Sequence, residues 1–322
     1  LGLRYDNSDQ SELSRTRNRR TTLRNIQLGD INENNLYGYL NLEIDAGKWL
    51  FEPGVRFDYF KFAYVDLLDS TYTHKSLTKA IVSPKFNTLY NLNGNVQLYF
   101  STGFGFHSND ARTVLNNQAK DVLPFAFGSD LGLNFKPNRR IIANVALWYL
   151  FLQQEFVYVG DEGIVEPSGR TRRQGIDLGL RWQLTDWLFT HVDVNYSHGR
   201  SVDEEVGSQF IPLAPIWTSS GGLSFDKDNF SGGLRYRYLG DRPANEDNSI
   251  VAKGYSVFDF NLDYNWSRIG IGFTIENIFN TEWNETQFAT ESRLQFESTS
   301  VEEIHFTPGT PFFFKGKISY KF

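Results

Sequence analysis

The feature that most limits the fold of this chain is a strict alternation of apolar and polar residues. Between Ser256 and Trp266 the sequence reads SVFDFNLDYNW, with Phe, Leu, Tyr and Trp at one parity and Asp or Asn at the other. The segments IGIGFTIE from Ile269, GIDLGLRWQL from Gly175 and FFFKGKISYKF from Phe312 repeat the pattern. A period of two is typical of β-strands with one apolar and one polar face. The chain is therefore predicted to be all-β.

The composition points to a surface that meets lipid. Aromatic residues make up 16% of a chain whose mean hydropathy is only -0.41. Trp and Tyr serve surfaces that contact lipid headgroups, because each has an apolar part and a polar part. The net charge of -6 gives no reason to expect nucleic acid, and the absence of cysteine excludes disulfides and thiolate sites. Since there is no methionine, we expect a mature or truncated product.

The connections between the alternating segments are sorted by length. The longest mostly apolar run, Ile141 to Leu152, is too short for a membrane-spanning helix of roughly 20 residues. Short and long connections alternate, as in antiparallel membrane barrels with turns at one rim and loops at the other. We predict a transmembrane up-and-down β-barrel with about 14 strands in this chain, in preference to a soluble sandwich. The predicted short turns are DAGK (45–48), NLNG (91–94), KPNR (136–139), TD (185–186), DKDN (226–229) and one near Ser267, and the predicted long loops are 11–35, 65–77, 108–122, 159–170, 199–213, 241–252 and 281–310.

In a barrel the two parities of each strand have fixed environments. We predict that Phe258, Phe260, Leu262 and Tyr264 face lipid, and that Asp259, Asn261 and Asp263 face a wet lumen. The loops 108–122, 199–213 and 281–310 should share the end opposite Phe322. Other lumen residues are expected to be Arg56, Asp58, Arg181, Asp193, Arg235, Arg237, Lys315 and Lys317, and an aromatic girdle near the short turns to be Trp49, Trp182, Trp187, Phe230, Trp266, Tyr320 and Phe322.

Four motifs resemble the barrel of TonB-dependent outer-membrane receptors: GFHSNDAR (105–112), LGDRP (239–243), ENIFNTEW (276–283) and FTPGTPFFFKGKISYKF (306–322). The resemblance covers essentially the whole chain. It implies the bacterial outer membrane as location. It also implies that the C-terminal strand, with Phe322, Tyr320 and Ile318, is the signal read by the barrel-assembly machinery.

The sequence departs from this family in one respect. Family members carry an N-terminal plug domain and an energy-coupling box, and close barrels of about 22 strands. Neither feature is found here. We therefore expect residues 1–322 to be the C-terminal portion of such a barrel, with the first and last strands each lacking a partner on one side.

Motifs for catalysis are not found. Five scattered histidines lack metal-ligand spacing on one element, and there is no GxSxG elbow, HExxH motif or phosphate-binding loop. His191 shares its face with Asp193 and Asn195, which indicates a lumen lining rather than a ligand. We expect no enzyme activity, no cofactor and no metal site.

Arginine clusters are the best candidates for ligand binding. Guanidinium groups bind carboxylates and phosphates in bidentate fashion, so the functional interpretation is capture of an anion such as a metal chelate. The alternative is solvated loop charge, or contact with lipopolysaccharide phosphates. Haem is disfavoured because the FRAP/NPNL box is not found, and copper because there is no methionine. The candidate residues are Arg15, Arg17, Arg19 and Arg20 on the first long loop, Arg112 at the end of its motif, and Arg172 and Arg173 at the edge of another loop.

The predicted function is import of a scarce ligand across the outer membrane, with a ferric siderophore as the default. The resemblance implies that a TonB energy-coupling complex acts through the part of the protein not in this chain. Other expected partners are the assembly machinery, outer-membrane lipid with lipopolysaccharide, and a small-molecule or metal-chelate ligand. Two alternatives remain open: a passive channel of 14 strands, and a structural or adhesive barrel that transports nothing.

Overall fold

The computed structural model describes residues 1–322 except 18–20, 70–73, 108–121, 160–163 and 168. Every regular element in this described part is a β-strand, which confirms the predicted all-β class. None of the described residues belongs to a helix long and apolar enough to cross a membrane. The chain divides into two compact units, one of residues 1–88 with 101–128 and one of residues 89–100 with 129–322.

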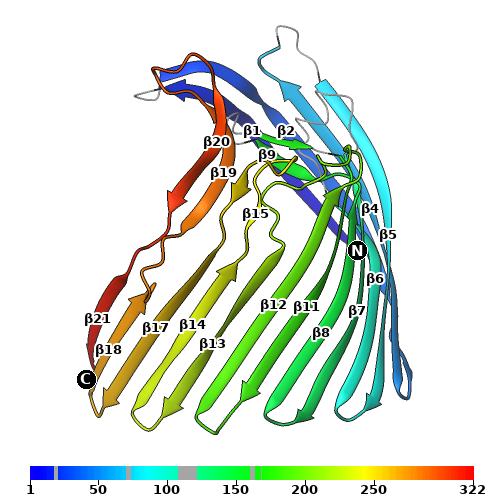
Figure 1. The fold of residues 1–322 in the computed structure, drawn as a ribbon. Helices are drawn as coiled ribbons and strands as arrows, with labels where there is room; N and C mark the ends of the chain where they lie inside the picture. The colour runs from blue at the N-terminus through cyan, green and yellow to red at the C-terminus, as the bar shows by residue number, and fades with distance from the viewer. Residues whose placement is uncertain (18–20, 70–73, 108–121, 160–163, 168) are drawn as a thin grey trace. The chain divides into compact units, whose positions relative to one another are not determined.

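The first unit is built from long antiparallel strands (Figure 1). Strand β2 pairs with both β1 and β4, and the short β3 pairs with β4. Gly47 takes a φ of 73° in the turn between β3 and β4, and its N–H donates to Asp45 Oδ1 at 3.0 Å. This is the predicted DAGK turn. The strands are β1 (Gly2–Arg17), β2 (Thr21–Asn41), β3 (Ile44–Ala46), β4 (Trp49–Asp66) and most of β5 (His74–Asn93).

One face of β4 carries the apolar core of this unit beside a buried charge. Phe60 and Phe62 stack at 5.4 Å between ring centroids and pack with Val122 and Leu123. Asp58 lies on the same face, is fully buried, and accepts hydrogen bonds from Arg56 at 2.7 Å and Asn35 at 3.0 Å. The residues of opposite parity, Phe57 and Tyr59, are exposed. The alternation therefore separates the two faces as predicted.

The prediction of a long loop over residues 11–35 is wrong. The β1–β2 pairing runs from Gly2↔Tyr37 to Arg17↔Thr21, with register irregularities near Ser8, Leu13 and Arg15. Because most of these residues are polar at both parities, their sequence pattern predicts a loop. A hairpin with water on both faces needs no apolar face, because ladder hydrogen bonds hold it together.

The second unit is an antiparallel meander whose main strands lie side by side in chain order (Figure 1). Strands β5, β6 (Val96–Phe106) and β7 (Phe125–Asn138) contribute to both units. The principal sheet of the described residues has 15 strands including β3, close to the predicted 14. The main strands of the second unit are β8 (Ile141–Leu152), β11 (Thr171–Gln183), β12 (Leu188–Ser201), β13 (Trp217–Lys227), β14 (Phe230–Leu239), β17 (Tyr255–Trp266), β18 (Ile269–Glu276) and β21 (Phe313–Tyr320).

Connections in the second unit are sorted by length, as predicted. Tight turns join β11 to β12, β13 to β14 and β17 to β18 at the end that also holds the C-terminus, where Lys321 N donates to Arg268 O at 2.8 Å. Asp228 and Ser267 reverse the chain there with φ of 55° and 52°. The connections 202–216, 240–254 and 277–312 all lie at the opposite end, because antiparallel strands alternate direction. The predicted loop 108–122 falls almost entirely outside the described residues.

Three of the long connections contain small strand pairs of their own. The segment 281–310, predicted as a loop, therefore includes a regular hairpin that is separate from the main sheet. The pairs are β9 (Phe156–Val159) with β10 (Ile164–Pro167), β15 (Arg242–Pro243) with β16 (Val251–Ala252), and β19 (Asn284–Ser292) with β20 (Val301–Pro308).

Register in the second unit confirms the two predicted faces. Arg235 pairs with Asp259 and Asp263 pairs with Gly272, so the charged residues share one side of the sheet. On the other side, ring centroids of Tyr236 and Phe258 lie 5.9 Å apart. The aromatic row continues along β17, β18 and β21 through Phe260, Phe273 and Phe314. A shift of one residue would exchange these two sets.

The outer strands of the sheet each have a single partner. Among the described residues, β1 pairs with β2 alone and β21 pairs with β18 alone. Every residue of β21 is exposed. A free strand edge presents unpaired N–H and C=O groups, which hydrocarbon does not tolerate.

The apolar face can be tested by charge placement. Leu178 is exposed on the apolar face in the middle of β11, whereas Ser220 lies on the polar face of β13 opposite Asp193. We predict that Leu178→Lys destabilises the intact protein in lipid vesicles by about 2–4 kcal/mol, since it places an ammonium group in hydrocarbon. Denaturant unfolding would measure this. Ser220→Lys is the matched control and should change stability by less than about 1 kcal/mol; equal effects would show that the two faces do not differ.

Candidate functional site

The charged face of the last four main strands forms the most developed polar surface of the second unit. β14 supplies Arg235 and Arg237, β17 supplies Asp259 and Asp263, and β21 supplies lysines. These side chains lie on one face because directly paired residues of antiparallel strands point the same way. Gly222 pairs directly with Arg235 and leaves room for its long side chain, since a Cβ at Gly222 would lie 3.4 Å from Arg235 Cγ.

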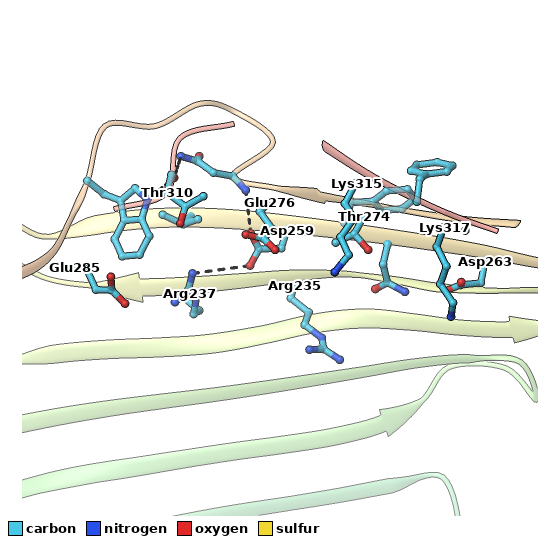
Figure 2. Close-up of a pocket in the computed structure, with 17 residues that line it drawn as sticks. Arg235, Arg237, Asp259, Asp263, Thr274, Glu276, Glu285, Thr310, Lys315 and Lys317 are labelled. Atoms are coloured by element: carbon cyan, nitrogen blue, oxygen red, sulfur yellow. Dashed lines mark hydrogen bonds and ion pairs between the residues drawn. The ribbon is translucent and has the colours of Figure 1, made fainter. Parts of the chain in front are cut away.

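This face encloses a hollow of about 580 Å³ (Figure 2). Its charged lining is balanced, with four cationic and four carboxylate side chains. A hollow of this kind suits a polar ligand that carries its own charges. The charged residues that line it are Arg235, Arg237, Lys315, Lys317, Asp259, Asp263, Glu276 and Glu285, and Trp283 is an aromatic residue of the lining.

The carboxylate of Asp259 is engaged, whereas three of the cations have no carboxylate partner among the residues that the structure describes. Asp259 lies 3.9 Å from Arg237 and accepts a hydrogen bond from the backbone N–H of Asn277 at 2.9 Å. Among the described residues, no carboxylate oxygen lies within 4.0 Å of the nitrogen atoms of Arg235, Lys315 or Lys317. Figure 2 shows these three side chains among the residues that line the hollow. They remain available for anionic groups of a ligand or of another protein segment.

Trp283 forms an aromatic wall at the end of the hollow nearest the long connections. Its ring lies 4.8 Å from the ring of Tyr255 and 5.3 Å from the guanidinium carbon of Arg237. Its indole N–H donates to Thr310 O at 3.0 Å, which fixes the ring plane. Trp283 also lines a second hollow of about 630 Å³ toward the loops, with Lys253, Glu282 and Phe306. A fixed ring shared by two hollows is suited to stack on a planar ligand.

The ENIFN motif positions Trp283 through two asparagines in the left-handed region. Asn277 and Asn280 both have φ of 48°. The fully buried Asn277 donates to Thr281 O at 2.8 Å and to Thr310 O at 3.1 Å, and its Oδ1 accepts from Thr281 N at 2.9 Å. Asn280 Oδ1 accepts from Phe312 N at 2.9 Å. Asn is one of the few residues that adopts this conformation at low cost, which explains the motif. The sequence marked Asn277 only as part of a resemblance.

The long connections of this unit are fastened to one another. Gln287 is buried and both donates to and accepts from the backbone of Lys253, at 2.7 and 3.0 Å. Phe210 N donates to Glu246 O, and Leu213 N donates to Pro243 O at 2.7 Å. The long connections next to the hollow are thus joined by hydrogen bonds and do not form independent loops.

Arg242 of the LGDRP motif lies inside this loop structure. It is 7% exposed, and its Nη1 has no hydrogen-bond partner among the described residues. Desolvation by burial lowers the pKa of Arg242 from its usual value, although the nearby Asp241 opposes the shift. The LGDRP motif thus places a buried arginine within the loop structure.

Of the arginines predicted as ligand-binding residues, Arg172 and Arg173 are those whose side chains the structure describes. Arg172 and Arg173 are adjacent on β11 and therefore point to opposite faces. Arg173 is paired with Glu155, and Arg172 is exposed on the apolar face. Arg15 and Arg17 belong to β1 and not to a loop, and their side chains are not described. Arg19, Arg20 and Arg112 lie outside the described residues.

The C-terminal aromatic residues lie on the apolar parity of β21. Ile318 pairs with Ile271 and Tyr320 with Ile269, and Ile318 is 82% exposed. The rings of Tyr320 and Phe322 meet edge-on at 5.1 Å. These residues are therefore accessible along a free edge, and their role as an assembly signal stays a prediction.

The first unit has a smaller hollow of its own, of about 390 Å³. Arg56 lines it and is held by Asp58 and by the ring of Tyr37, whose centroid lies 4.4 Å from its guanidinium carbon. Lys85 lies on the same hollow. Arg56 and Asp58 share one face as predicted, but their charges satisfy each other, so this hollow offers less unpaired charge than the one in the second unit.

Comparison with known proteins gives the same architecture. Residues 1–278 match the model of the TonB dependent receptor-like, beta-barrel family. Among solved structures, the ferric citrate transporter FecA in the unliganded form is 17% identical with a TM-score of 0.74, over 92% of this chain and 46% of that chain. The siderophore receptor PiuA from Acinetobacter baumannii is 14% identical with a TM-score of 0.70, over 93% and 44%. The ferric-catecholate import receptor Fiu from K12 E. coli is 16% identical with a TM-score of 0.71, over 94% and 46%.

At these identities the solved structures show the shared fold alone, and the chain spans about half the length of each of them. The family model covers 278 of the 322 residues. Together with the antiparallel sheet and its two faces, this establishes the all-β membrane-barrel class and the outer membrane as location. The chain belongs to the family of TonB-dependent receptor-like β-barrel proteins.

Proposed function

We propose that this chain is part of the wall of a receptor that imports a scarce small ligand across the outer membrane, with a ferric siderophore as the default ligand class. The observation that carries the proposal is the hollow beside Trp283, in which Arg235, Lys315 and Lys317 have no carboxylate partner among the described residues. Cationic side chains bind the anionic oxygens of metal chelates, and an aromatic ring stacks on planar ligand groups. Iron-related names among the structural neighbours support this ligand class.

The transport itself requires parts of the protein beyond this chain. We propose that residues 1–322 are the C-terminal portion of the barrel, and that a plug and further strands complete it. The single partners of β1 and β21 and the coverage of about half of the structural neighbours support this. In this arrangement the TonB complex drives release of the ligand through the plug, and no bond of the ligand is broken by the barrel.

Two further partners follow from the position of the strands. The exposed C-terminal residues Phe322, Tyr320 and Ile318 are proposed to be read by the barrel-assembly machinery before β21 gains its second neighbour. The apolar face, with aromatic residues near the tight turns, is proposed to contact outer-membrane lipid and lipopolysaccharide.

The ligand proposal is tested by uptake of ⁵⁵Fe-citrate and of a ⁵⁵Fe-catecholate by cells that depend on the intact receptor. We predict that Trp283→Leu reduces uptake about five- to tenfold, because an aromatic contact of about 1–1.5 kcal/mol is removed. Trp266→Leu is the matched control, since Trp266 is exposed on the apolar face outside the hollow. It should leave uptake unchanged.

The same measurement in cells without TonB separates the competing functions. Loss of uptake supports an energy-coupled receptor. Uptake that persists without TonB would replace the proposal by the passive channel, and absence of uptake for every chelate, with normal receptor levels, would favour a structural barrel.

The assembly proposal has its own test. We predict that Phe322→Ser lowers the amount of folded receptor in the outer membrane several-fold, because it removes the exposed terminal ring that meets Tyr320 edge-on. Heat-modifiable mobility in gels measures the folded fraction. Phe296→Ser, at the exposed tip of the β19–β20 hairpin, is the matched control; equal losses in both variants would contradict a special role for the C-terminal ring.

A further inference from the structure

Two arginines on the membrane side of the sheet lie directly opposite each other. Arg172 of β11 pairs with Arg200 of β12, and the next pair on the same face is Gln174 with His198. Arg172 has the parity of Ile176 and Leu178, which is opposite to that of Asp177 and Arg181. The pair therefore belongs to the apolar face, outside the polar face with the candidate site. Like charges in direct opposition destabilise a strand pair.

The neighbouring arginines are neutralised by carboxylates, whereas this pair has no such partner in the part of the chain that the structure describes. Arg170 lies 2.6 Å from Asp203, Arg181 lies 2.9 Å from Asp193, and Arg173 is bonded to Glu155. Among the described residues, no carboxylate oxygen lies within 4.0 Å of the guanidinium nitrogens of Arg172 or Arg200.

Arg200 has only neutral contacts in the described part of the chain. It donates to Gly199 O at 2.7 Å, and its guanidinium carbon lies 4.3 Å from the ring centroid of Phe210. The contact with Phe210 orients the guanidinium but adds no negative charge. An anion bound between Arg172 and Arg200 would therefore neutralise their positive charge.

The position of the pair along the strand matches a headgroup layer. Ten positions separate Trp182, near the tight turn, from Arg172. At a rise of about 3.3 Å per residue and a tilt of about 40°, this spans about 25 Å along the membrane normal, the height of the apolar band of an outer-membrane barrel. Tyr149, Tyr196 and Trp217 lie on the same face just below the pair. With the long connections outward, Arg172 and Arg200 lie at the outer leaflet.

We propose that Arg172 and Arg200, with His198, bind a phosphate group of lipopolysaccharide on the membrane face of the barrel. Two guanidinium groups on neighbouring strands match the charge and the oxygen geometry of a phosphate monoester. The bound phosphate neutralises the opposed arginines, while the aromatic residues below contact the acyl chains. This proposal takes one element from the proposed function, which is that the long connections lie on the outer side of the membrane.

The test measures binding of purified bisphosphorylated lipid A to the intact receptor in detergent, by native mass spectrometry. Wild-type receptor should bind it, and Arg172→Gln with Arg200→Gln should weaken binding by at least about tenfold, as expected for losing charged hydrogen bonds. Arg268→Gln is the matched control, because Arg268 is an exposed arginine at the opposite end of the strands. It should bind lipid A as wild type does. Lipid A without its phosphates should bind weakly to the wild-type receptor. Its affinity should be similar to that of intact lipid A for the double variant.

Several outcomes would overturn the proposal. These are unchanged binding in the double variant, equal loss in Arg268→Gln, or full displacement of lipid A by millimolar inorganic phosphate, which would indicate a site for free phosphate. Arg172→Lys with Arg200→Lys keeps the charge and should retain part of the binding even if the glutamine variant folds poorly. Siderophore uptake should be normal in the double variant, so a failure here is distinct from a failure of the transport proposal.

Discussion

The pairing of backbone hydrogen-bonding groups is the constraint on which this structure depends. In hydrocarbon no water is present to satisfy an N–H or C=O group, so a spanning chain without long apolar helices must form a paired sheet. The meander from β8 to β21 meets this requirement with strands whose neighbours follow one another along the chain. The tight turns then fall at one end and the long connections at the other, since each strand reverses direction.

The same pairing sorts the chemistry of the side chains. Because paired residues point to one side, Arg235 meets Asp259 on the polar face while Tyr236 meets Phe258 on the apolar one. Adjacent residues of β11 show how sharp the separation is: Arg173 is neutralised by Glu155, and Arg172 faces the opposite way without a described carboxylate partner. A single sheet thereby supplies a charged hollow on one face and an apolar surface on the other.

Side-chain hydrogen bonds, rather than the sheet, build the part of the site where ligand chemistry is concentrated. Asn277 and Asn280 leave the strand geometry at the end of β18 and tie the following segment to residues 310–312. Each bond contributes on the order of 1 kcal/mol, but together they fix the plane of Trp283 beside Arg237. A fixed ring loses little conformational entropy when a ligand binds, so the entropic cost of binding is small.

What the sequence alone determined was the alternation: the all-β class, the faces of β17, the tight turns and the polar-face position of Arg181, Asp193 and Arg235 all follow from a period of two with turn residues at its breaks. Tertiary structure decided what no local pattern encodes. The polar stretch 11–35 became a hairpin because long-range ladder bonds outweigh its lack of an apolar face. Trp283 was brought to Arg237 and Tyr255, because contacts between separate strands depend on register and on loop hydrogen bonds, which residues distant in sequence set jointly.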